Sequence, residues 1–320
     1  MSEFLLTRTL PEDATGAALR ADVLTGLTRT PKTLPPKWFY DAHGSELFER
    51  ITELPEYYPT RAEREILLAR GPDIAAATGA RTLVELGSGS SDKTRHLLDA
   101  LTGLRTYVPV DVSGSALERA GRALAAERPA LSVHALVADF TDGLALPGTP
   151  GPRLVAFLGG TIGNLLPAER AAFLASLRAL MSPGDALLLG TDLVKDPSVL
   201  VPAYDDAAGV TAAFNRNVLN VVNRELGADF DPGAFRHVAL WDAEREWIEM
   251  RLRARTAMTV KVRALDLTVE FAAGEEVRTE VSAKFREEGV RGELAAAGLD
   301  LVHWWTDREE RFALSLSTVR

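Results

Sequence analysis

The middle of the chain alternates short apolar runs with longer amphipathic segments. The apolar runs cover 81–86, 106–112, 131–140, 153–161 and 186–193, and each is typical of a buried strand. Between them, segments such as 115–129 and 167–181 repeat their apolar residues at helical spacing. Apolar strands that alternate with amphipathic helices predict an α/β fold with a doubly wound, mostly parallel sheet.

The pattern changes on both sides of this region. Helices are expected over 13–30, 45–52 and 60–77, and Thr60 with Glu63 matches a capping box at the start of the last one. After Val194, a mostly helical stretch over 198–227 precedes two long amphipathic strands, 246–264 and 267–285. A helix over 286–299 and a pair of strands, 299–307 and 311–320, are expected to complete the far edge of the sheet.

These flanking segments predict a second, discontinuous domain. We expect the sheet domain to comprise 61–195 plus 286–320, and an α+β domain to be built from 1–60 plus 196–285. Open α/β sheets bind ligands outside the carboxyl ends of their strands. The second domain is therefore expected to cover that edge and to bind the substrate.

Composition excludes several kinds of site and partner. The 320-residue chain has no cysteine, which rules out disulfides, thiolate metal sites and cysteine nucleophiles, and its five histidines lack ligand spacing, so no metal is expected. A formal net charge of −9 argues against nucleic-acid binding, and the longest apolar runs are too short to span a membrane. The N-terminal residues have no basic segment followed by an apolar run. We expect a cytoplasmic monomer that acts on a small molecule.

The loop after the first of these strands, VELGSGSSDKT, has glycines at positions 87 and 89 that let the backbone approach a ligand closely. A dinucleotide-binding loop would have a third glycine at position 92, where this chain has an aspartate beside which a pyrophosphate would sit poorly. S-adenosylmethionine (SAM) has no phosphate and carries a sulfonium cation. A loop that begins with Glu85 and contains Asp92 suits SAM better.

Two further strand ends fit the same cofactor. Asp111 can accept hydrogen bonds from ribose hydroxyls, while Asp139 and Phe140 suit the amine and the ring of adenine. The alternative is that both aspartates only cap loops. An NAD-dependent oxidoreductase is disfavoured by the missing third glycine and by Asp139, and a non-catalytic SAM-binding regulator stays open.

Six segments together resemble one family, the L-histidine Nα-methyltransferases of ergothioneine biosynthesis. They are LPPKWFYD (34–41), LPEYYPTR (54–61), GGTIGNL (159–165), GTDLVKD (190–196), AYDDAAGVTAAFNRN (203–217) and TEVSAKF (279–285). The likeness runs from about residue 16 to the end, and departs from the family pattern at Ser90, where Thr is expected, and at Gly160, where Ser is usual. It implies a Rossmann-like methyltransferase sheet and three methyl transfers from SAM to histidine, giving hercynine. Another amino acid or amine as the acceptor is the alternative.

The resemblance also implies which residues bind each ligand. Those implied for the cofactor are Gly87, Lys93, Asp111, Asp139 and Phe140. Those implied for histidine are Tyr57, Asn164, Tyr204, Glu280 and Ser282, with Gly159 close to both ligands.

Chemical roles follow from these residue types. Tyr57 and Asn164 would orient the reacting amine, and Tyr204 would donate to the carboxylate. Glu280 and Ser282 are two residues apart on an expected strand, so they share a face and can read both imidazole nitrogens. Less specific roles are expected for other side chains: Met250 in the imidazole pocket, Phe48 and Tyr40 as further rings, Tyr58 as packing, and Asp206 as a helix cap.

Overall fold

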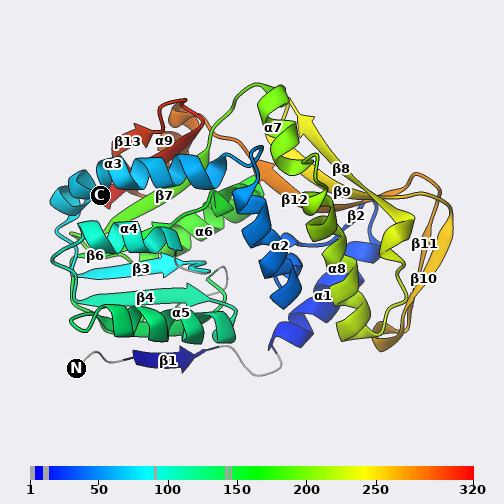
Figure 1. Cartoon of the computed structure of the whole chain (residues 1–320), viewed down its shortest axis with the longest axis horizontal. Coiled ribbons are helices and arrows are strands. Elements are labelled where there is room, and N and C mark those ends of the chain that lie inside the picture. Colours follow the sequence, from blue (N-terminus) through cyan, green and yellow to red (C-terminus); the bar gives the residue numbers. More distant parts are fainter. Residues whose placement is uncertain (1–3, 10–13, 90–91, 141–143, 145) are drawn as a thin grey trace. The chain divides into compact units, whose positions relative to one another are not determined.

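The computed structural model describes residues 4–9, 14–89, 92–140, 144 and 146–320 (Figure 1). The chain forms two compact units. Unit 1 consists of Met1–Pro11, Pro59–Val194 and Phe285–Arg320, and unit 2 consists of Glu12–Tyr58 and Lys195–Lys284. The expected division assigned all of 1–60 to the second domain. It was wrong for the first strand, β1 (Phe4–Arg8), which pairs in parallel with β5 (Ser132–Val137) inside unit 1.

Unit 1 contains an eight-stranded sheet in the order β1-β5-β4-β3-β6-β7-β14-β13. Its remaining strands are β3 (Thr82–Leu86), β4 (Thr106–Asp111), β6 (Arg153–Phe157), β7 (Ala186–Asp192), β13 (Leu299–Thr306) and β14 (Phe312–Val319). The first six strands of this order are parallel, and β14 runs antiparallel to both β7 and β13. The predicted doubly wound sheet and its C-terminal edge are confirmed.

Helices cover both faces of this sheet, as the alternating pattern predicts (Figure 1). One face packs against α3 (Pro59–Thr78), α4 (Asp92–Ala100) and α5 (Gly114–Glu127) in a shared apolar core. On the other face lie α6 (Pro167–Leu180) and α9 (Glu287–Ala296), and Phe173 of α6 packs on Phe157 of β6 with ring centroids 4.8 Å apart. The strand order reverses between β3 and β6, the kind of position where such sheets bind ligands.

Unit 2 is an α+β unit with a four-stranded sheet in the order β2-β12-β9-β8. These strands are β2 (Lys32–Thr33), β8 (Phe235–Asp242), β9 (Trp247–Ala254) and β12 (Glu276–Ala283). The helices are α1 (Ala14–Thr28), α2 (Ala42–Glu53), α7 (Pro197–Tyr204) and α8 (Val210–Leu226), with short 3-10 turns η1 (Pro36–Phe39), η3 (Pro232–Ala234) and η4 (Arg263–Leu265). Side chains from these helices join Ile248, Met250 and Leu252 of β9 in one core, so the helices pack on one face of the sheet.

The prediction of two long strands over 246–264 and 267–285 was wrong. Each is interrupted, and the interior pieces β10 (Met258–Val262) and β11 (Leu267–Phe271) form a separate antiparallel hairpin. The first strand breaks where the Arg255 N–H bonds to the Ala234 carbonyl, and the second where Gly274 turns at φ 82°. Strand β8 was not expected at all, yet it pairs with β9 along its whole length.

Among the described residues, no helix combines the length and the apolar character that crossing a membrane requires.

Candidate active site

The residues implied for the cofactor gather at the carboxyl edge of the unit 1 sheet. Gly87 follows β3, Asp111 ends β4, and Asp139 with Phe140 follows β5. Gly159 follows β6, on the other side of the point where the strand order reverses. Because these four strands are adjacent and parallel, their ends bring the five residues to one edge.

Asp111 is held by the loop it faces. Its carboxylate accepts hydrogen bonds from the Gly89 N–H at 3.3 Å and the Ser113 N–H at 2.9 Å. Burial raises the pKa of Asp111, although these backbone donors act in the opposite direction. A carboxylate has about four lone-pair positions, so each oxygen can accept a further bond, such as one from a ribose hydroxyl.

Phe140 lies beside the glycine-rich loop. A Cβ added at Gly87, where φ is 68°, would lie 3.6 Å from the ring. The ring meets Phe157 edge to face, with centroids 5.4 Å apart and planes at 64°. Packing therefore constrains the position of Phe140, and this ring with Asp139 next to it could hold an adenine ring and its amine.

Lys93 and Gly159 are joined by Glu63, a residue that was expected to take part in a capping box. Glu63 is fully buried; its Oε1 accepts the Gly159 N–H at 2.7 Å, and its Oε2 forms an ion pair with Lys93. The expected capping box was wrong, because α3 begins at Pro59 and the Glu63 carboxylate points to these two groups. Glu63 can position Lys93 and the backbone of the loop after β6. This role was not predicted, because the spacing of Glu63 from Thr60 matches a capping box.

Glu85 does not present a charge to the loop as expected. Its carboxylate is buried and accepts hydrogen bonds from the hydroxyls of Thr94 and Tyr107. Burial raises the pKa of Glu85 to about 7, although these hydroxyls lower it. Glu85 therefore ties β3 to α4 and β4 inside unit 1. Ser90 and the side chain of Asp92 lie outside the described part of the structure.

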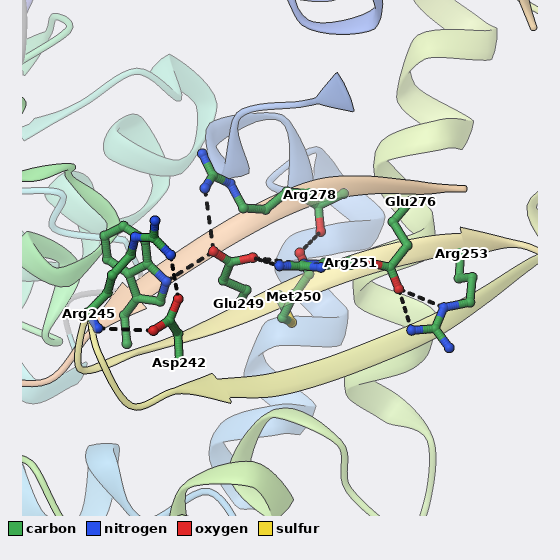
Figure 2. Close-up of polar contacts among 10 residues, drawn as sticks. Asp242, Arg245, Glu249, Met250, Arg251, Arg253, Glu276 and Arg278 are labelled. Carbon is green, nitrogen blue, oxygen red and sulfur yellow. Dashed lines mark hydrogen bonds and ion pairs between the residues drawn. The ribbon is translucent and has the colours of Figure 1, made fainter. Parts of the chain in front are cut away.

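In unit 2, a β-bulge decides which way Glu280 points. Before the bulge, Glu276 and Arg278 of β12 lie opposite Arg253 and Arg251 of β9, on the face that carries a row of ion pairs (Figure 2). Thr279 is the extra residue, and after it Glu280 lies opposite Met250. Residues directly opposite each other in an antiparallel pair share a face.

The bulge therefore moves Glu280 from the ion-pair face to the helix-covered face. Ser282 lies opposite Ile248 on that same face, so the expected sharing of a face by Glu280 and Ser282 is observed. Regular alternation would have left Glu280 on the side of Arg278. Met250 is 2% exposed and is the cross-strand neighbour of Glu280, which suits a pocket wall.

Ser282 belongs to a buried triangle of polar groups. Its Oγ lies 2.8 Å from the Tyr204 hydroxyl, and Lys284 Nζ donates to both oxygens at 2.8 Å. The ammonium also lies over the Tyr204 ring, 4.7 Å from its centroid. All three side chains are at least nine-tenths buried. Lys284 was not expected from the sequence, and its position two residues after Ser282 was the available signal.

A second buried network supports Tyr204 and the bulge. His237 Nε2 lies 2.7 Å from the Tyr204 carbonyl, and its Nδ1 lies 2.8 Å from the Asn215 amide nitrogen. Asn215 Oδ1 in turn accepts the Thr279 hydroxyl at 2.6 Å. Burial lowers the pKa of His237. The Asn215 amide nitrogen can only donate, so Nδ1 accepts from it and Nε2 donates to the Tyr204 carbonyl. The network connects α7, β8, α8 and β12, which no sequence spacing revealed.

The two adjacent tyrosines have different surroundings. Tyr57 is partly exposed and its ring meets Phe48 edge to face, with centroids 6.1 Å apart. Phe48 also packs against Tyr40 and Phe214, which extends the aromatic cluster. Tyr58 is buried, and its hydroxyl accepts a hydrogen bond from Lys195 at 2.8 Å.

The remaining expected residues have clear local roles. Asn164 ends the 3-10 turn η2 (Thr161–Asn164) in unit 1, after Gly160 at φ 70°. Asp206 accepts the N–H groups of Val210 and Thr211 at the start of α8, as a helix cap does. Within the described ranges, no three histidine or carboxylate side chains lie together as a metal site would require.

A doubly wound sheet with carboxylates at adjacent strand ends, and a loop without a phosphate-binding third glycine, is typical of a SAM-dependent methyltransferase. The family model described as "Histidine-specific methyltransferase, SAM-dependent" matches residues 19–319. The chain belongs to this family, so the expected enzyme class, the methyl donor and a small-molecule substrate are confirmed.

Curated relatives extend over nearly the whole chain. A histidine N-alpha-methyltransferase of Mycolicibacterium smegmatis is 61% identical over 315 residues, which cover 98% of each chain. A protein of the same name from Mycobacterium tuberculosis is 59% identical over 311 residues, covering 96% of this chain and 97% of the relative. An L-tryptophan methyltransferase of Psilocybe serbica is 31% identical over 334 residues, covering 92% of this chain and 91% of the relative.

Proposed function

We propose that this enzyme transfers three methyl groups from SAM to the α-amino group of L-histidine, which gives hercynine, the first step of ergothioneine biosynthesis. The observation that carries the proposal is that Glu280 and Ser282 share one face of β12, with Tyr204 bonded to Ser282, in a chain of the histidine-specific family. The two relatives named histidine N-alpha-methyltransferase support the choice of the α-amino group.

In this proposal Glu280 and Ser282 bind the imidazole ring through hydrogen bonds. Glu280 accepts the ring N–H, and the Ser282 hydroxyl bonds to the other ring nitrogen. In this proposal Tyr204 donates to Ser282 instead of to the substrate carboxylate, because the pair has only one other hydroxyl proton and the imidazole needs it. Met250 packs against the ring. A site built to hydrogen-bond a polar group rejects analogues that lack it, because its own buried groups would stay unpaired. This accounts for selection of histidine over amino acids with an apolar ring.

The reaction requires a neutral amine. Its lone pair attacks the methyl carbon in line with the S–C bond, and the electrons of that bond return to sulfur, which leaves as a neutral thioether. After the first and second transfers the new ammonium loses a proton to water before it can react again. The third transfer leaves a quaternary ammonium that has no proton to lose.

Tyr57 and Asn164 would hold the amine during these steps. Asn164 offers an amide oxygen and an NH2 group, so it can orient the amine and the carboxylate together. Tyr57 would orient the amine through its hydroxyl, and its ring face would favour the growing positive charge. Positioning of this kind supplies a large share of the barrier reduction when the leaving group is already good.

The methyl donor would be held by the strand ends of unit 1. Asp111 would bind the ribose hydroxyls, Asp139 and Phe140 the adenine, and Gly87 would leave room for close approach. Lys93 would contribute from α4, and the backbone at Gly159 would lie near both ligands. We propose that the enzyme works as a cytoplasmic monomer, without a metal, membrane or nucleic-acid partner; light scattering of the purified protein tests its monomeric state.

Incubation of the purified enzyme with SAM and histidine tests the reaction. Mass spectrometry should detect products with one, two and three added methyl groups in sequence, and the last should accumulate. Fragmentation should place all three on the α-nitrogen. An intact enzyme that binds SAM but forms no methylated histidine would refute the proposal, and methylation of the ring would refute the assignment to the α-amino group.

One observation favours a second candidate, methylation of a different amino acid. The Psilocybe relative, 31% identical along most of its length, is named as an L-tryptophan methyltransferase. Competition between histidine and tryptophan for limiting SAM distinguishes the two. Preference for tryptophan would contradict the roles given to Glu280 and Ser282.

A further inference from the structure

Lys284 is a buried cation that touches both hydroxyls assigned to histidine recognition. It is 4% exposed, follows directly after β12, and its backbone N–H bonds to the Glu246 carbonyl at 2.8 Å. Its ammonium donates to the oxygens of Tyr204 and Ser282, each at 2.8 Å. A surface lysine would not need such partners, so this arrangement calls for a function.

The hydrogen-bond directions in this triangle follow from the chemistry of its members. An ammonium has three donors and accepts nothing, so both hydroxyl oxygens act as acceptors toward Lys284. The two hydroxyls are also 2.8 Å apart, so one of them donates to the other. One hydroxyl proton is thereby used inside the triangle. The Tyr204 phenol is the more acidic hydroxyl and the better donor, so it donates to Ser282, and the Ser282 hydrogen points away from Lys284.

We propose that Lys284 is a positioning residue that makes this hydroxyl pair a donor toward the substrate. This inference rests on the proposed function, in which Ser282 faces one imidazole nitrogen. With a donor on that side and the Glu280 carboxylate as acceptor on the same strand face, the pocket takes the neutral imidazole in a single tautomer. An imidazolium would direct a second N–H at oxygen lone pairs that Lys284 already engages.

The test uses two histidine analogues in which a thiazole replaces the imidazole. One isomer has its ring nitrogen at the position of Nδ1 and the other at the position of Nε2, and neither has a ring N–H. The enzyme should prefer the isomer whose nitrogen meets the hydroxyl donor, by about tenfold in kcat/KM. In Lys284→Met, which keeps an unbranched stem but loses the donors, that preference should fall below about threefold.

Two further variants decide whether Lys284 acts through Ser282. Ser282→Ala should lose the isomer preference, and the double variant with Lys284→Met should lose no more than Ser282→Ala alone. Lys195→Met is the matched control: it removes another lysine that donates to a tyrosine hydroxyl at 2.8 Å and lies over its ring, but it should keep the preference.

The outcomes separate this inference from the proposed function. Absence of histidine methylation by the unmodified enzyme would refute the proposed function. Equal loss of activity toward both isomers in Lys284→Met would instead refute the role of Lys284, because a purely structural role lowers both alike. Absence of any isomer preference in the unmodified enzyme would also overturn it.

A measurement on the unmodified enzyme keeps the inference testable if Lys284→Met does not fold. Histidine labelled with 15N in the ring is bound in the presence of S-adenosylhomocysteine, which prevents turnover. The nitrogen chemical shifts should show one neutral tautomer. An imidazolium, or an even mixture of tautomers, would refute the proposed role.

Discussion

The two units position their proposed ligand-binding groups in different ways. In unit 1, the groups sit at the ends of adjacent parallel strands, where the fold itself brings Gly87, Asp111 and Asp139 to one edge. In unit 2, Tyr204, Glu280 and Ser282 depend on a bulge and on buried hydrogen bonds between residues far apart in the chain. We therefore expect the first arrangement to tolerate changes in the side chains behind it, and the second to be sensitive to such changes.

The largest effect is expected from Glu280→Ala. It removes the proposed acceptor for the imidazole N–H, and it should weaken histidine binding at least about 100-fold while SAM binding changes less than about threefold. Asp139→Ala should show the opposite pattern. Calorimetry with each ligand measures both, and equal losses for the two ligands in Glu280→Ala would contradict the separation between the units.

Replacement of His237 tests the buried network of unit 2. His237→Phe fills the space but leaves the Tyr204 carbonyl and the Asn215 amide without this partner, which should lower the free energy of unfolding by about 2–3 kcal/mol. The substitution should also weaken the binding of histidine more than the binding of SAM. Urea unfolding measures the first effect, with replacement of the exposed His43 by alanine as the control. Unchanged stability would show that the network is not needed.

The raised pKa of Glu85, a buried residue of unit 1, predicts that the stability of the protein depends on pH. Between pH 4.5 and about 7, the folded protein keeps a proton on Glu85 that the unfolded chain has lost. The free energy of unfolding therefore falls as the pH rises through this interval, and Glu85→Gln removes that loss. From about pH 5.5 to about pH 8, the variant should gain about 2 kcal/mol relative to the unmodified protein.

Unfolding by urea at both pH values measures this difference. Glu127→Gln is the control, because Glu127 is exposed and its pKa is lowered by the hydrogen bond from Arg95. The control should not gain stability at the higher pH. If Glu85→Gln shows a constant offset at all pH values, the carboxyl group is ionised throughout and the predicted titration is wrong.

Glu63→Gln probes whether unit 1 also relies on one buried side chain. The amide keeps the shape of the carboxylate, but its NH2 group must face either the Gly159 N–H or the Lys93 ammonium, both of which are donors. SAM binding should weaken about tenfold, and histidine binding much less. Unaltered SAM affinity would show that strand ends alone suffice.

The sequence predicted unit 1 better than unit 2 for a physical reason. Apolar strands and strand-end carboxylates follow directly from local pattern, so the sheet and its edge residues were found without the structure. The local pattern failed for Glu63, whose spacing from Thr60 fits a cap, and for β1, which is held by pairing with a distant strand. Both depend on partners more than 90 residues away.

In unit 2 the resemblance to a family, rather than periodicity, identified Glu280 and Ser282. Alternation along β12 places Glu280 with Arg278 on the ion-pair face, and only the register shows the extra residue at Thr279. Lys284 and His237 were missed because their significance lies in the geometry of buried hydrogen bonds, which no spacing in the chain encodes.

The bulge at Thr279 makes the proposed substrate recognition depend on strand register as well as on residue identity. Every side chain that follows it on β12 owes its face to one inserted position. If β12 ran through this point without the bulge, Thr279 would take the place of Glu280 opposite Met250, and Glu280 would lie opposite Glu249 on the face that carries the arginines. A new acceptor specificity can therefore arise on this strand through a shift in register, without any substitution among the residues proposed to touch the ligand.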